Sequence, residues 1–163
     1  MTESGAEAPA AVILLGANYD DSITFPRFFE KHILPPLADY AERLHRRGKY
    51  LMTHTDGENR RLLPLYLRAG FDVADSVCPH PMTRSTLEEI RAAFAGRITI
   101  WGGIPSILLC PESAGEEDFR RAIDDLLARY GHESRFVLGV ADMVTADADW
   151  ARLQYITARV NES

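Results

Sequence analysis

The stretch that decides the fold is YLMTHTDGEN, residues 50–59, which joins two different kinds of pattern. Its first four residues are apolar or β-branched and predict a buried strand. The polar and glycine residues after them predict a turn, and the leucine spacing of residues 62–69 predicts a helix. A buried strand that ends in histidine, aspartate, glycine and asparagine is typical of the mouth of an α/β active site.

The same strand, turn and helix unit occurs five times along the chain. Short apolar or β-branched runs occupy residues 11–15, 50–53, 71–74, 98–101 and 136–138, each followed by a polar or glycine-rich turn. Strands that alternate with helices predict a parallel sheet, and the carboxyl ends of its strands meet at one ligand-binding edge. The sequence therefore predicts an α/β fold of about five βα units with one functional edge.

Proline and tryptophan residues give specific expectations for two of the predicted helices. An apolar stripe predicts a helix over residues 27–44, and Pro35-Pro36 predicts a kink or a restart within it, because proline disrupts a helix interior. A last helix over residues 148–160 is expected to bury Trp150, Leu153, Ile156 or Thr157, and Val160. Trp101 and Trp150 are both assigned to the core rather than to a cofactor stack.

Caps and glycines mark the helix ends. Overlapping capping boxes in residues 85–89 predict a helix start, and Ser113 with Glu116 predicts another. Glycine tolerates the left-handed conformation that ends many helices. The glycines expected in that role are Gly48, Gly70, Gly96 and Gly131.

Length and composition restrict the class of protein. A chain of 163 residues is long enough for one core, so we expect a disordered leader over residues 1–9 and a single domain over residues 10–163. The net charge of −6 argues against nucleic acid as a partner. The apolar segment at residues 8–15 is too short to span a membrane, and Cys78 and Cys110 are expected as free thiols of a cytoplasmic protein.

The first candidate site combines His54, Asp56 and Asp142. His54 and Asp56 are two residues apart, so on a continued strand they point the same way and share a ligand or a divalent metal, zinc or another. Alternatively, Asp56 caps the next helix and His54 hydrogen-bonds locally. Asp142 follows the last strand and is either a third metal ligand or general base, or a cap for the last helix. We assign all three as catalytic and metal-binding candidates.

Substrate-binding candidates lie in the other turns at the same edge. They are Asn18, Asp20, Gly57, His80, Gly102 and Gly103. Asn18 and Asp20 either hydrogen-bond a polar substrate or form a turn before Pro26. His80 belongs to a Cys-x-His pattern that either binds metal or consists of a buried cysteine and a turn histidine. Gly102 and Gly103 allow close approach of a ligand or of another backbone.

Five motifs in the right order resemble the carboxyl-terminal half of the uroporphyrinogen decarboxylase superfamily. They are Thr24-Phe25-Pro26 with Leu34-Pro35, His54-Thr55-Asp56-Gly57, Ala69-Gly70-Phe71-Asp72, Trp101-Gly102-Gly103-Ile104 and Leu138-Gly139-Val140-Ala141-Asp142. The resemblance covers the chain from about residue 12 onward. It implies a partial TIM barrel, about five βα units of a (βα)8 barrel, whose members include decarboxylases and zinc-dependent, corrinoid-linked methyltransferases.

The sequence departs from both branches of that family. The decarboxylases carry their substrate-binding arginines and key aspartate in the amino-terminal half, which this chain lacks, and their late histidine corresponds to Val140. The methyltransferases hold zinc with a His-x-Cys and a later cysteine, at positions that Asp56 and Val140 occupy here. His54 and Asp56 therefore suit a harder metal than a thiolate site does.

The resemblance implies decarboxylation or methyl transfer on a small molecule, within a larger barrel. The alternative is a non-catalytic half barrel that binds a ligand or a partner chain. Five parallel strands without their partners have two open edges and an uncovered inner face. We therefore expect a homo-oligomer or a complementary amino-terminal half-barrel chain.

Overall fold

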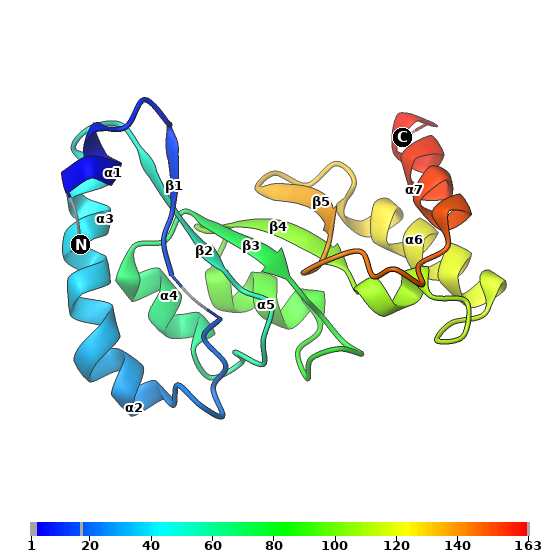
Figure 1. Cartoon of the computed structure of the whole chain (residues 1–163), viewed down its shortest axis with the longest axis horizontal. Helices are drawn as coiled ribbons and strands as arrows, with labels where there is room; N and C mark the ends of the chain where they lie inside the picture. Colours follow the sequence, from blue (N-terminus) through cyan, green and yellow to red (C-terminus); the bar gives the residue numbers. More distant parts are fainter. Residues whose placement is uncertain (1–2, 17, 163) are drawn as a thin grey trace.

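The computed structural model describes residues 3–16 and 18–162 of the chain. The first two residues of the expected leader and Ala17 of the first expected turn lie outside this part. Five strands form one parallel sheet in the order in which they occur along the chain (Figure 1). They are β1 (Val12–Leu14), β2 (Tyr50–His54), β3 (Val73–Val77), β4 (Thr99–Ile104) and β5 (Phe136–Val140). Together with the alternating helices, this confirms an α/β pattern consistent with a partial TIM barrel.

Helices connect the strands in every interval of the sheet. The helical elements are α1 (Glu3–Glu7), α2 (Pro26–Phe28), η1 (Phe29–Ile33), α3 (Leu34–His45), α4 (Leu63–Ala69), α5 (Leu87–Phe94), η2 (Ser106–Leu109), α6 (Glu116–Tyr130) and α7 (Trp150–Glu162). None of the helices in the described ranges is long and apolar enough to cross a membrane.

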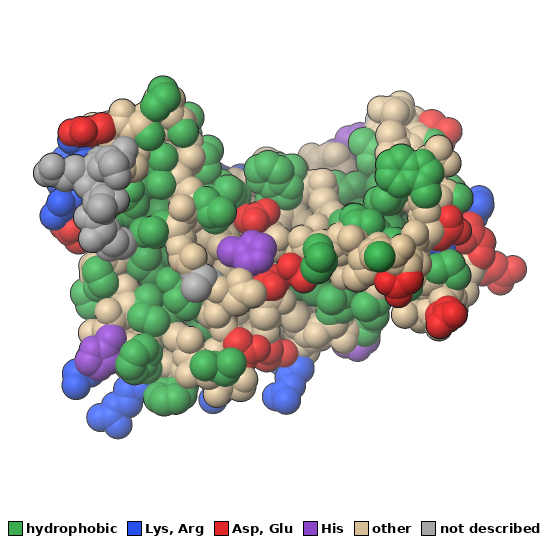
Figure 2. Space-filling model, viewed as in Figure 1, with side chains coloured by type: hydrophobic (Ala, Val, Ile, Leu, Met, Phe, Trp, Pro, Cys, Tyr) green, Lys and Arg blue, Asp and Glu red, His purple; other side chains and the backbone are tan. Residues whose placement is uncertain are grey.

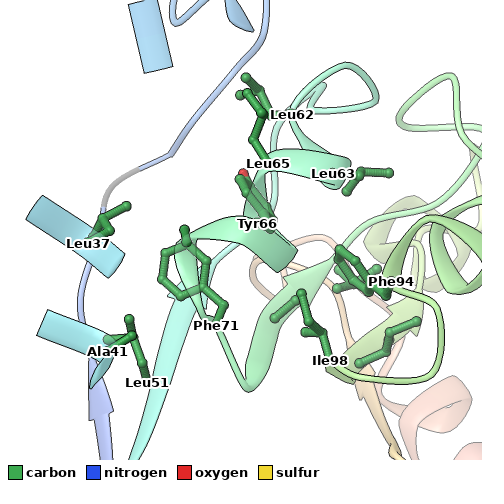
Figure 3. Packing of buried hydrophobic residues seen from close by; sticks show 14 of the residues in the cluster. Leu37, Ala41, Leu51, Leu62, Leu63, Leu65, Tyr66, Phe71, Phe94 and Ile98 are labelled. Carbon is green, nitrogen blue, oxygen red and sulfur yellow. The ribbon is translucent and has the colours of Figure 1, made fainter. Parts of the chain in front are cut away.

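The main core lies between one face of the sheet and helices α3, α4 and α5. Leu51, Ala74 and Ile100 point to this side from β2, β3 and β4, and each is at most 1% exposed. Tyr66 of α4 lies at the centre of the cluster, with ring contacts to Phe71 and other aromatic side chains (Figure 3). Burying each large side chain contributes roughly 1.5–3 kcal/mol, which fixes the helices against the sheet.

The opposite face of the sheet is uncovered. Strand residues alternate between faces, so the neighbours of the core residues point away from the helices. Those exposed apolar side chains are Val12, Leu14, Tyr50, Trp101 and Val137, which we call the inner face. Val12 is paired with Tyr50, and Trp101 with Val137. Trp101 is 45% exposed, so its assignment to the core is wrong.

The proline pair restarts the helix, as its sequence predicts. Residues of η1 form a π-helix, and α3 then begins at Leu34 with proline in its first turn. Proline is tolerated there, since the first-turn amide has no intrahelical acceptor. The amphipathic stripe of α3 buries Leu37, Tyr40 and Leu44 against the core.

Two of the predicted caps behave differently from each other. Thr86 and Glu89 form the reciprocal capping box that begins α5, as residues 85–89 predict. The predicted capping box of Ser113 and Glu116 is wrong, because the N-cap of α6 is Gly115 and no side chain caps this helix. The reason is local: the amides of Ser113 and Ala114 both donate to the Cys110 carbonyl and close a separate turn.

The predicted role of glycines at the helix ends is confirmed in part. Gly70 ends α4 with a left-handed φ of 81°, and Gly48 and Gly96 also have positive φ. Gly131 does not, since its φ is −58° and its amide still donates to Leu127, so the helical hydrogen bonding continues through it.

Three further expectations need correction. Residues 3–7 of the expected disordered leader form α1, because Ala6 is buried in the main core and the carbonyl of Ala8 accepts a hydrogen bond from Lys49. Trp150 and Val160 are 69% and 44% exposed, so their predicted burial is wrong, whereas Ile156 of α7 is buried as expected and Arg152 is buried as well. Strand β3 begins later than predicted and extends to Val77. Cys78 and Cys110 are free and buried, as expected.

Candidate metal centre

The candidate site lies where β2, β3 and β5 end. His54 is the last residue of β2, Asp56 follows it, and Asp142 lies two residues beyond β5. One donor atom from each of these three side chains lies within 4.8 Å of the other two. Figure 2 shows a histidine among acidic side chains near the middle of the viewed face. The parallel sheet therefore brings together all three side chains assigned as catalytic and metal-binding candidates.

His54 is held by a carboxylate from the neighbouring strand. Asp75 is the register partner of His54, and its Oδ2 lies 3.1 Å from His54 Nδ1. A proton on Nδ1 that is donated to Asp75 leaves the lone pair on Nε2. That Nε2 lies 3.7 Å from Asp56 Oδ2, so two electron-rich atoms face each other. Such a pair is stabilised by a cation or by a second proton on the imidazole.

Asp56 has one satisfied and one unsatisfied oxygen. Asn18 Nδ2 donates to Asp56 Oδ2 at 3.0 Å. Asp56 Oδ1 is buried and accepts no hydrogen bond from the described residues. A buried carboxylate oxygen without a partner costs free energy, on the order of 1–3 kcal/mol. A metal ion would satisfy this oxygen if both Asp56 oxygens coordinated it, since Oδ2 is the one that faces His54.

Asp142 completes the cluster from an exposed segment. Its φ is 61°, a left-handed conformation that aspartate adopts more readily than most residues. The preceding residue is fixed, because the Ala141 amide donates to the Ile104 carbonyl at 2.8 Å. The alternative of Asp142 as a cap is wrong, since α7 begins only at Trp150. Asp56 also caps no helix, because the N-cap of α4 is Leu62.

The donor set fits a divalent cation. One imidazole nitrogen and two carboxylates suit zinc, manganese or iron(II), whereas a thiolate-rich zinc site needs cysteines that these positions lack. Two observations make the fit specific: the free Asp56 Oδ1 and the Asp75 carboxylate behind His54. A carboxylate behind a ligating histidine is the usual second layer of a metal site.

The family model of uroporphyrinogen decarboxylase (URO-D) matches residues 3–163, which is nearly the whole chain. The chain belongs to the uroporphyrinogen decarboxylase family. A search of curated proteins gives no match.

In this uroporphyrinogen decarboxylase family member, hydrogen bonds to the Asp20 side chain connect the loop that follows β1 to the turn that follows β2. Its carboxylate accepts hydrogen bonds from the amide and hydroxyl of Ser22 and from the amide of Glu58. The Ser22 hydroxyl is the main reason that the pKa of Asp20 lies below its ordinary value. A Cβ added to Gly57 would lie 3.4 Å from the Asp20 side chain, so the two residues are in contact. Asn18 differs, because it contacts the cluster directly through Asp56.

The other substrate-binding candidates of this family member lie outside the cluster. Gly102 has a φ of 139°, and an added Cβ would lie 2.6 Å from the Val77 carbonyl oxygen. Of the two alternatives for this glycine, the structure shows close approach of another backbone. Gly103 is packed against Phe136. His80 and Gly103 line a separate cavity of about 490 Å³ between α5 and α6.

The sequence did not identify Asp75, which contacts the site, and two buried titratable residues, Tyr66 and Cys78, lie near its charged groups. Asp75 was missed because it lies inside a strand, and only the register places it beside His54. Tyr66 is fully buried, and its hydroxyl has no partner among the described residues. Burial raises the pKa of Tyr66, and the nearby Tyr19 and Asp56 add to this effect. Cys78 is also buried, and burial, followed by the charges of Asp56 and Asp142, raises its pKa to about 11.

Proposed function

We propose that this family member is an enzyme component that binds a divalent metal through His54, Asp56 and Asp142 and acts on a small molecule. The observation that carries the proposal is the convergence of these three side chains within 4.8 Å at the carboxyl edge. Asp75 and Asn18 support it, because each holds one ligand by a hydrogen bond to the side chain.

The charge of the site favours methyl or other group transfer over decarboxylation of a polycarboxylate. Asp20, Asp56, Asp75 and Asp142 all lie in this region, and an acidic site repels an anionic substrate. A neutral acceptor with an ionisable thiol or hydroxyl suits the site better. In such a reaction the acceptor loses its proton to solvent and forms a bond to the methyl carbon, and the electron pair of the broken methyl–donor bond stays with the donor.

Each side chain has a distinct role in this proposal. The metal would lower the pKa of a bound thiol, alcohol or water, so that the nucleophile forms near neutral pH. Asp75 keeps the proton on Nδ1 of His54 and fixes the ring. Asn18 positions Asp56, while the exposed Asp142 is the ligand most accessible to solvent and to a substrate.

Metal analysis tests the proposal. Native protein and the His54→Ala and Asp56→Ala variants are dialysed against zinc or manganese, and bound metal is measured by mass spectrometry. We expect about one metal ion per chain in the native protein and a loss of at least tenfold in affinity in both variants. His45→Ala is the matched control, because His45 also pairs with an aspartate, Asp72, at 2.8 Å. Equal metal content in all four proteins would refute the site.

The inner face supports a second proposal, that another copy of this chain covers it. Val12, Leu14, Tyr50, Trp101 and Val137 are exposed together on one face, and β1 and β5 are open edges. Exposed parallel edges are rarely left unpaired. A non-catalytic role, in which the chain only completes a partner, is favoured if association occurs without metal binding.

A further inference from the structure

A second cavity lies at the opposite edge of the sheet from the metal centre. It has a volume of about 550 Å³ and lies at the amino ends of β2, β3 and β4, next to the residue that precedes β5. We call it the amino-edge cavity. The polar residues that matter in its lining are His45, Tyr50, Asp72, Arg97, Thr99 and Arg135.

The two arginines of this cavity differ from most others in the chain. Arg43 and Arg46 of α3, for example, each form an ion pair with an acidic side chain one turn away. Within the described residues, neither Arg97 nor Arg135 has a carboxylate within ion-pairing distance. Arg135 instead donates from Nη1 to the carbonyl oxygen of Arg97 at 3.2 Å. This hydrogen bond holds the two arginines next to each other.

The single acidic residue of the lining does not neutralise these arginines. Asp72 Oδ2 accepts hydrogen bonds from the Leu51 amide and from His45 Nε2, both at 2.8 Å. This oxygen is therefore engaged by its own hydrogen-bond partners rather than by an arginine. The amino-edge cavity keeps two uncompensated guanidinium groups in a chain whose net charge is −6.

The rest of the lining suits an organic molecule rather than a bare ion. Leu67, Phe71 and Val73 provide an apolar wall, and Tyr50 is 53% exposed at the same cavity. The volume lies within the usual range for small-molecule sites. Planar guanidinium groups bind phosphate oxygens in pairs, and two of them match a doubly charged tetrahedral group.

We propose that the amino-edge cavity binds a phosphate-bearing small molecule through Arg97 and Arg135. The site is separate from the metal centre and would influence it only through the strands between them. The proposed reaction at the metal centre does not require this phosphate-bearing ligand.

Calorimetric titration with inorganic phosphate and with pyrophosphate tests the proposal on the intact chain. The titrations are made at constant ionic strength and in the presence of EDTA, so that metal binding does not contribute. We expect saturable binding, and about a tenfold or greater loss of affinity in Arg97→Gln and in Arg135→Gln. Arg27→Gln is the control, because Arg27 lies in α2, outside the cavity, and is expected to leave phosphate binding unchanged.

Further variants and a second anion separate phosphate recognition from general charge attraction and from metal binding. Arg97→Lys keeps the charge but loses the paired donors, so we expect an intermediate affinity. Asp56→Ala is expected to bind phosphate normally, which separates this site from the metal centre. Absence of saturable binding, equally tight binding of succinate, or unchanged affinity in both glutamine variants would overturn the proposal. Unliganded melting temperatures of all variants show whether each one is folded.

Discussion

The Nδ1 atom of His54 lies 3.1 Å from the Oδ2 atom of Asp75, across two neighbouring strands. The two residues are register partners in the parallel ladder, so the pair is fixed by the backbone of the sheet. We predict that Asp75→Asn weakens metal binding about 10- to 100-fold while the chain remains folded, because the amide no longer accepts the Nδ1 proton as a charged partner. Metal titration followed by calorimetry measures this change. Asp39→Asn removes an acidic partner of Arg43 on α3 and is expected to leave the metal affinity unchanged.

Asp56 gives a prediction for stability. Its Oδ1 atom is buried without a partner, so the metal-free protein contains an uncompensated carboxylate oxygen. Without metal, Asp56→Asn is expected to be as stable as the native chain or more stable, because the charge is removed and Asn18 keeps an acceptor. With metal, the native chain gains stability as the ligand concentration exceeds its dissociation constant, and the variant does not. Thermal melts at several metal concentrations distinguish these outcomes, and a variant that melts lower without metal would contradict the first one.

Cys78 makes stability depend on pH. Burial, with a contribution from Asp56 and Asp142, raises its pKa from 9.0 to about 11. Since the folded state holds the thiol proton more tightly than the unfolded state, the stabilising contribution is complete below pH 9 and is lost as the pH rises to 11. Its size is up to about 2 kcal/mol. Urea unfolding in EDTA at pH 8 and pH 11 should show a smaller loss for Cys78→Ala than for the native chain. Cys110→Ala, the other buried thiol, is expected to behave like the native chain.

Much of the architecture follows from local sequence signals. The five apolar runs predict the five strands, and the order of the strands follows from the βα alternation. The Thr86 capping box and the Pro35-Pro36 restart are also predicted, because both depend on neighbouring residues alone. The two tryptophans are predicted wrongly, since hydrophobicity does not show which face of a sheet the rest of the protein covers.

The candidate site could be predicted only in part for a related reason. His54, Asp56 and Asp142 are visible as polar residues at strand ends, and the parallel sheet brings those ends together. Asp75 lies within β3 beside another polar residue, Ser76, and its role depends on a register that a single sequence does not reveal. The Ser22 amide donates to Asp20 two residues away, in the kind of turn that is the predicted alternative for this residue, whereas the hydrogen bond from the distant Glu58 amide follows no spacing rule.

Gly102 gives a prediction about the packing of β3 against β4. A Cβ at this position would lie 2.6 Å from the Val77 carbonyl oxygen, and its φ of 139° is unfavourable for other residues. We expect Gly102→Ala to lower the free energy of unfolding by more than about 3 kcal/mol, or to prevent folding. Gly48→Ala is the control for φ alone, because no atom lies within 4 Å of its Cβ position. It should cost about 1 kcal/mol, as measured by urea unfolding. Equal costs in the two variants would show that the backbone contact is unimportant.

The inner face predicts self-association. Light scattering after size-exclusion chromatography is expected to give twice the mass of one chain, because a two-fold pair would bury Leu14 and Trp101 of both copies. Trp101→Glu should shift the equilibrium to single chains. Trp150→Glu is the matched control, since Trp150 is also an exposed tryptophan but lies on α7, outside the inner face. A native chain that stays a monomer at high concentration, or dissociation by both variants alike, would contradict the prediction.

The ligands of the candidate centre come from distant parts of the chain, with His54 and Asp56 after β2 and Asp142 after β5. A bound ion would therefore act as a reversible cross-link that closes most of the chain into a loop. Chelation would remove this cross-link without changing a covalent bond. The segment between β5 and α7 would then open more often, and a protease would report the metal content of the protein by how quickly it cuts there.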